Sequence, residues 1–122
     1  MVKSIATNTY KMKYCSIKKL KKLGFKYDED SEKYTMTFPV YRNNKVSLLF
    51  GTILCDEQGH ISLNVTDRNG ESYYPFYCIR YGNYDVMLSI INASFINKFK
   101  KIGIKEIENA RKTKNQRNNV NQ

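Results

Sequence analysis

The chain has 122 residues, of which 41% are hydrophobic, and its formal net charge at pH 7 is +10. This length predicts one domain with one core, and the ordinary apolar content excludes a chain that is disordered throughout. No apolar run approaches the roughly 18 residues of a membrane span, and the N-terminus lacks a signal peptide's apolar stretch, so we expect a cytoplasmic protein.

The first predicted element is a short helix within "SIKKLKKLGF", residues 16–25. Ser16 is a suitable N-cap, and Ile17, Leu20 and Leu23 fall on one side of the helix. Gly24 provides a left-handed stop, after which we expect Phe25 to fold back on Leu20. The sequence therefore predicts an amphipathic helix whose lysines face water.

Four strands are predicted next, joined by short turns. Pro39 indicates an edge or a bulge in the first strand, and Gly51 indicates a bulge in the second. The turns between them carry "RNNK", "DEQG" and "DRNG", and connections this short require antiparallel neighbours. We expect a meander with these strands: 34–41, 46–56, 60–67 and 71–81.

A longer helix is predicted over 84–102, with Asn83 as its cap and Gly103 as its stop. We expect Ile104 to pack on Phe99, just as Phe25 packs on Leu20. The fold class is α+β, in the order αββββα: one domain over 1–104, with both helices on one face of a four-stranded antiparallel sheet. Residues 105–122 are expected to form a short basic helix and a flexible tail.

The three cysteines are Cys15, Cys55 and Cys78. Their number is odd and no CxxC occurs, so we expect free thiols rather than a disulfide framework.

Catalytic signals are weak throughout the chain. His60, the single histidine, falls in a turn beside Asp56 and Glu57, and this stretch lacks the paired histidine and cysteine ligands that are typical of a zinc site. The segment "DEDSE" lacks the spacing and the glycine of a calcium loop. We therefore expect no enzyme activity, no catalytic residue, no metal and no cofactor.

The positive charge is concentrated at the two ends of the chain. Residues 1–27 hold eight lysines and no acid, residues 28–32 contribute −4, residues 33–82 contribute +1 and residues 83–122 contribute +5. Like charges four residues apart on a helix repel by a few tenths of a kcal/mol, so a helix that keeps Lys18 and Lys22 indicates a role for its positive field. The alternative is an ordinary solvated helix face. The candidate phosphate-binding residues are Lys18, Lys19, Lys21, Lys22, Lys98, Lys100, Lys101, Arg111 and Lys112.

Tyrosine is the favoured aromatic residue, with ten tyrosines against six phenylalanines and no tryptophan. On the predicted sheet, Tyr41, Tyr73 and Tyr77 share the face that the helices leave open. Such a face can stack bases or contact a protein partner, although tyrosine also covers half-buried strand surfaces without any ligand.

We therefore expect a small non-enzymatic protein that binds DNA or RNA electrostatically and with weak sequence specificity. The bias toward Lys, Asn, Ile and Tyr is typical of A/T-rich genomes, and small basic proteins are common in phages and mobile elements. The alternative is a phage-type inhibitor or adaptor, similar in role to an anti-CRISPR protein, that binds a host nucleoprotein complex. Neither hypothesis involves a membrane, and the oligomeric state stays open.

Overall fold

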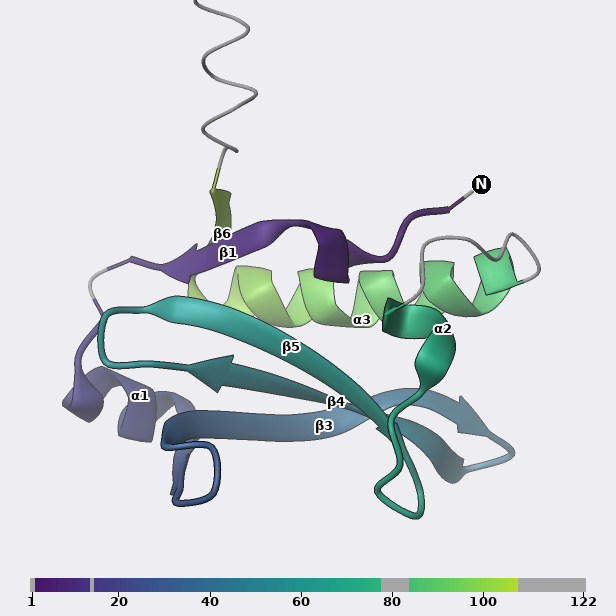
Figure 1. Ribbon diagram of the computed structural model, residues 1–122, viewed down its shortest axis with the longest axis horizontal. Coiled ribbons are helices and arrows are strands. Elements are labelled where there is room, and N and C mark those ends of the chain that lie inside the picture. Colours follow the sequence, from purple (N-terminus) through teal and green to yellow (C-terminus); the bar gives the residue numbers. More distant parts are fainter. Residues whose placement is uncertain (1, 14, 78–83, 108–122) are drawn as a thin grey trace, which may run out of the picture.

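The computed structural model describes residues 2–13, 15–77 and 84–107, which form three α-helices, a short 3₁₀ helix and six strands (Figure 1). The helices are α1 (Ile17–Leu23), α2 (Tyr74–Tyr77) and α3 (Asp85–Ile102), and the 3₁₀ helix η1 is Ile5–Thr7. The strands are β1 (Thr9–Met12), β2 (Lys26–Asp28), β3 (Lys33–Asn43), β4 (Val46–Cys55), β5 (His60–Asp67) and β6 (Ile104–Ile107).

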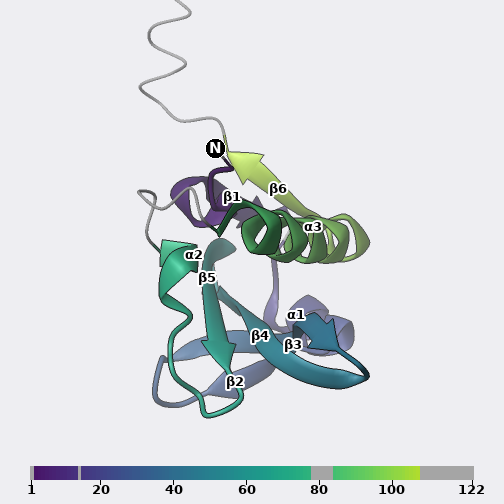
Figure 2. The same ribbon diagram turned by 90° about the vertical axis from the view of Figure 1, so that its right-hand side faces the viewer.

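All six strands belong to one antiparallel sheet in the order β2-β3-β4-β5-β1-β6. The sheet curves around α3, so that β1 and β6 pass on one side of the helix while β3 and β4 pass on the other (Figures 1 and 2). The helix therefore fills the concave face, and the convex face of the sheet points outward.

The expected α+β class with an antiparallel sheet is confirmed, whereas the expected strand number is wrong. β3, β4 and β5 form the predicted meander, but β1, β2 and β6 were not expected. These three strands have only four, three and four residues, too few for an alternating pattern to stand out. Residues 105–107 belong to β6 rather than to the expected short helix, and the rest of that helix and tail lies outside the described residues.

The strand predicted over 71–81 is also wrong where it can be compared. An isolated bridge joins Thr66 to Ser72, and the chain then enters α2 instead of a ladder. Pro75 occupies the first turn of α2, where its missing N–H removes no helical hydrogen bond. Residues 78–81 lie outside the described part of the chain.

The special residues of β3 and β4 give one confirmed prediction and one correction. β3 pairs with β2 only over 33–35, so Pro39 lies on an open edge, and the register shifts between Pro39 and Tyr41. Gly51, in contrast, is in register with Phe38 and Val65 and forms no bulge. A Cβ at Gly51 would lie 2.7 Å from the Phe95 ring, so glycine is required there for the close approach of α3.

The predicted helix ends are confirmed for both α1 and the C-terminus of α3. Ser16 Oγ accepts a hydrogen bond from the Lys19 N–H at 3.1 Å, which caps α1. Gly24 and Gly103 both adopt the left-handed conformation, with φ of 102° and 82°. The cap expected at Asn83 lies outside the described residues, and the N-cap position of α3 is Tyr84.

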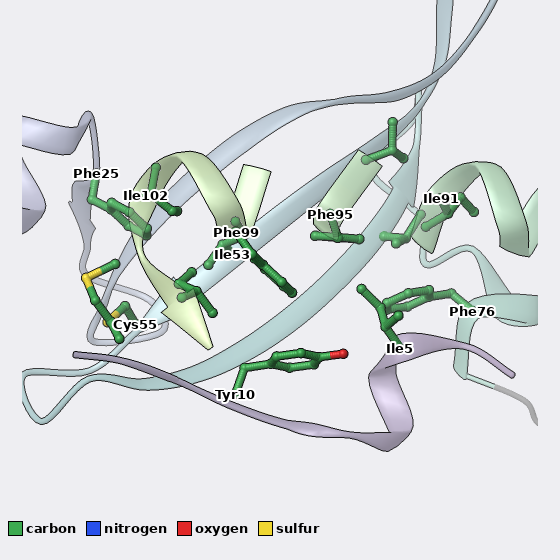
Figure 3. Close-up of a cluster of buried hydrophobic side chains, with 14 of the residues drawn as sticks. Ile5, Tyr10, Phe25, Ile53, Cys55, Phe76, Ile91, Phe95, Phe99 and Ile102 are labelled. Atoms are coloured by element: carbon green, nitrogen blue, oxygen red, sulfur yellow. The ribbon is translucent and has the colours of Figure 1, made fainter. Parts of the chain in front are cut away.

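The core lies between α3 and the concave face of the sheet (Figure 3). Phe95 is fully buried and contacts three other rings, with centroids 5.4 Å from Phe38, 5.7 Å from Phe76 and 6.0 Å from Phe99. Leu20 of α1 and Phe25, which follows the Gly24 stop, belong to the same cluster. The core therefore joins both helices to one sheet.

Candidate nucleic-acid interface

Helix α1 presents its lysines to solvent because Leu20, fully buried, fixes the opposite side of the helix in the core. Lys18, Lys21 and Lys22 are exposed. Lys19 is half-buried, and its Nζ donates a hydrogen bond to the carbonyl oxygen of Lys13 at 2.7 Å. This bond ties α1 back to the residue that follows β1.

Helix α3 carries three lysines in its last turns, and these lysines differ in how far they are exposed to solvent. Lys100 and Lys101 are exposed. Lys98 is half-buried, and its Nζ lies 4.9 Å from the centroid of the Phe38 ring, a cation–π geometry. Positive charge in this place also offsets the negative end of the helix dipole.

The two lysine-rich helix ends lie at the same end of the molecule in both views (Figures 1 and 2). The core makes this arrangement firm, since Phe25, next to Gly24, and Ile102, next to Gly103, belong to the same buried cluster (Figure 3). We call this surface the basic end and define it as Lys18, Lys19, Lys21, Lys22, Lys98, Lys100 and Lys101. Two segments about 80 residues apart in sequence thus combine their charge.

The exposed lysines of α1 are not held by direct ion pairs. Within the described residues, Lys18, Lys21 and Lys22 form no ion pair with a carboxylate at the 4.0 Å limit. The nearby acidic segment 28–32 turns on itself, and Asp28 Oδ2 accepts a hydrogen bond from the Ser31 N–H at 3.1 Å. The lysine charges therefore stay available to an external anion.

A groove of about 580 Å³ adjoins the basic end and adds lysines that the sequence did not single out. The ladder between β1 and β6 places Lys11 directly opposite Lys105. Neither strand was expected, so no sequence pattern could have joined these two residues. The groove is lined by Lys11, Met12, Lys13, Cys15, Glu57, Gln58, Lys105, Glu106 and Ile107.

The three tyrosines of the predicted stacking face occupy different settings. Tyr41 and Tyr73 are partly buried against the core. Tyr77, 43% exposed, accepts a hydrogen bond through its hydroxyl from the Val65 N–H at 2.8 Å. Tyr73 and Tyr77 do not share one face of a strand as predicted, because the chain forms α2 over Tyr74–Tyr77.

The turn at 56–60 is organised around one carboxylate. Asp56 Oδ1 accepts from the N–H groups of Gln58 and His60 at 2.9 Å, and its Oδ2 lies 3.0 Å from His60 Nδ1. Partial burial alone would raise the pKa of Asp56, but these bonds outweigh it and hold that pKa below its usual range. These hydrogen bonds of Asp56 stabilise the turn. Within the described residues, no set of three metal-ligating side chains gathers around a common point.

Arg111 and Lys112, the remaining candidate residues, lie outside the described part of the chain. None of the helices in that part is long and apolar enough to cross a membrane. Comparisons with protein-family models, with curated protein sequences and with solved structures give no match. The geometry of the chain itself therefore carries the functional inference.

Proposed function

We propose that the chain is a non-enzymatic protein that binds DNA or RNA through the basic end. The observation that carries the proposal is the union of the two lysine-rich helix ends on one surface. Two separate segments of the fold contribute charge there, so the surface is larger than one solvated helix face.

The charge arrangement favours a polyanion over a single small anion. Five exposed lysines extend over two helix ends, and those of α1 repel one another in the free protein. Phosphates of a nucleic acid relieve this repulsion and release condensed counterions, which drives binding at low salt. Lysine acts as a flexible point charge without a fixed hydrogen-bonding fork, so we expect weak sequence specificity.

Base stacking contributes less to this proposal than phosphate contacts do. Tyr41 and Tyr73 are partly buried, and the Tyr77 hydroxyl is engaged with the backbone of β5. We therefore expect duplex and single strands to bind with similar affinity at a given salt concentration. A strong preference for single strands would instead point to exposed aromatic rings.

The test is fluorescence anisotropy with labelled single-stranded and duplex DNA and RNA in a salt titration. The test variant changes all four lysines of α1 to glutamine. A matched control variant removes the same charge from exposed residues of the N-terminal segment, the turn end of the β3–β4 hairpin and the turn after β5, segments that lie away from α1 at the other end of the molecule (Figure 1). Its positions are Lys3, Arg42, Lys45 and Arg68.

We expect wild-type affinity to fall steeply between about 50 and 200 mM salt, as it does for proteins that neutralise several phosphates. The α1 variant should bind more weakly and show a shallower salt dependence, whereas the control variant should keep most of the wild-type affinity. Equal losses of affinity in the two variants would show that binding depends on the net charge of the protein and not on the basic end. Absence of binding to every probe would contradict the proposal and favour the alternative of a protein partner.

A further inference from the structure

Two cysteines 40 positions apart in sequence meet beside the groove. The Sγ atoms of Cys15 and Cys55 lie 3.9 Å apart, and both thiols are free. Cys55 ends β4 and is fully buried, whereas Cys15 is partly exposed and lines the groove. The pair thus consists of one thiol that solvent reaches and one that it does not.

The backbone around the pair holds Cys15 against the turn that follows β4. The Met12 N–H donates to the Gly59 carbonyl at 2.9 Å, just before Cys15. A Cβ at Gly59 would lie 3.2 Å from Cys15 Cβ and 2.6 Å from the Met12 carbonyl oxygen, so this contact is close. Ser16 then fixes the other side of Cys15 by capping α1. Bond formation requires the two sulfurs to move from 3.9 Å to about 2.05 Å apart.

We propose that Cys15 and Cys55 form a reversible disulfide in which Cys15 meets the oxidant in the groove. The oxidant is an anionic low-molecular-weight disulfide, of which glutathione disulfide is the probe. Lys11 and Lys105, opposite each other on β1 and β6, line the groove with Cys15 and Lys13, and these three lysines outnumber the two carboxylates there, Glu57 and Glu106.

The reaction proceeds by two thiol–disulfide exchanges. The Cys15 thiolate attacks one sulfur of the oxidant, a mixed disulfide forms at Cys15, and one glutathione thiolate leaves and takes up a proton. The Cys55 thiolate then attacks Cys15 Sγ, the protein disulfide forms, and the second glutathione leaves and is protonated. Two protein thiols are oxidised, and one glutathione disulfide is reduced to two glutathione molecules.

The second exchange is the slower one because Cys55 is a buried thiol. Burial, with a smaller contribution from the neighbouring Cys15 sulfur, raises the pKa of Cys55 to about 12. The contribution from Cys15 ends once that thiol has reacted, but burial still keeps the Cys55 thiolate scarce at neutral pH, so the mixed disulfide at Cys15 should accumulate before it resolves. Because a larger fraction of Cys55 becomes thiolate as the pH rises, the rate of this second exchange should increase with pH.

The test uses the full chain carrying Cys78→Ser, so that only the two cysteines of the pair remain. It is incubated with glutathione disulfide, quenched with acid and mapped by mass spectrometry of intact protein and peptides. We expect one glutathionyl group at Cys15 first, followed by loss of that group and a peptide link between residues 15 and 55. A dithiol reductant should reverse the link.

Two further variants define the order of events. Cys55→Ala, which keeps a small apolar side chain in the core, should stop at the mixed disulfide on Cys15. Cys15→Ser should leave Cys55 unmodified over the same time. Initial modification at Cys55, or a mixed disulfide in the Cys78→Ser chain that never resolves up to pH 9, would overturn the proposal.

The melting temperature gives an independent test of whether the bond fits the native fold. A link that closes a loop of about 40 residues should raise the melting temperature of the Cys78→Ser chain by about 10 °C. A lower melting temperature after linkage would show that the bond distorts the native structure and would contradict the proposal.

Discussion

α1 and α3 end in closely similar sequences, "KKLKKLGF" and "NKFKKIGI", but the two helices are held in place differently. Both carry lysines in the last turn, both end at a left-handed glycine, and both bury the residue after it, Phe25 or Ile104. α1 has seven residues and one buried side chain, whereas α3 has eighteen residues and five.

The N-terminal ends of the two helices also differ, because α1 is stabilised by a local hydrogen bond and α3 by bonds from a distant segment. Ser16 caps α1 with its own side chain. Within the described residues, the N-cap position of α3 has no side-chain cap, and the helix instead receives the N-terminal segment. Asp85 Oδ1 accepts from the Val2 N–H at 2.9 Å, and Asn92 Oδ1 accepts from the Ile5 N–H at 3.1 Å. The N-terminus of α1 thus depends on a local hydrogen bond, whereas that of α3 depends on tertiary contacts. At the C-terminus, both helices end at a glycine in the left-handed conformation.

The largest effect should come from removing the ring that α3 places at the centre of the core. Phe95→Ala should lower the free energy of unfolding by about 3–5 kcal/mol, because the ring is fully buried and leaves a cavity. Ile96→Ala, next to it and 39% exposed, is the matched control and should cost much less. Urea denaturation of both variants measures the difference, and similar losses would contradict the core assigned to α3.

Gly51→Ala tests the close contact between β4 and α3 from the other side. The new Cβ would overlap the Phe95 ring and the Val40 side chain, so we expect a loss of about 1–3 kcal/mol from overpacking. In a Phe95→Ala background the added methyl group has room on the side of the missing ring, and its cost should fall. A double-mutant cycle measures this coupling, and additive losses would argue against the contact.

The two glycine stops allow a direct comparison of the helices. Gly24→Ala and Gly103→Ala should each lower stability by about 1–2 kcal/mol, because an alanine pays a steric cost in the left-handed region. No described atom lies within 4 Å of a Cβ at Gly103, and a Cβ at Gly24 meets Met36 Cε at an ordinary 3.8 Å. The two losses in thermal or urea unfolding should therefore be similar, and a cost confined to one helix would contradict a shared local stop.

The smallest expected effect concerns the cap of α1. Ser16→Ala removes the acceptor for the Lys19 N–H and should cost about 1 kcal/mol. Ser16→Asp keeps an acceptor and should retain most of the stability. Urea denaturation again supplies the measurement, and equal losses in the two variants would show that the hydroxyl does not act as a cap.

Local rules predicted those features that a few neighbouring residues determine. Ser16, Gly24 and Gly103 behave as capping chemistry requires, and the turn between β3 and β4 has positive φ at Asn44 and Lys45. The long strands β3, β4 and β5 follow from their apolar patterns.

The features that the sequence did not predict depend on contacts between distant residues. β6 is a strand because β1 pairs with it, and Gly51 is small because α3 approaches it. Pro75 begins a helical turn where the apolar pattern favoured a strand. The sequence pattern indicates the α1 and α3 lysines as candidates, but their position at one end of the molecule, the groove and the contact between Cys15 and Cys55 follow only from the tertiary structure.

Lysine footprinting would test the basic end most directly. An amine-reactive acetylating reagent would be applied with and without the nucleic acid that binds best in the anisotropy experiment, and each lysine would be quantified by mass spectrometry. We predict that nucleic acid protects Lys18, Lys21, Lys22, Lys100 and Lys101 together and leaves Lys45, in the turn between β3 and β4, as reactive as in the free protein. Protection spread evenly over all lysines, or confined to Lys45 and its surroundings, would contradict the assignment of the basic end as the binding surface.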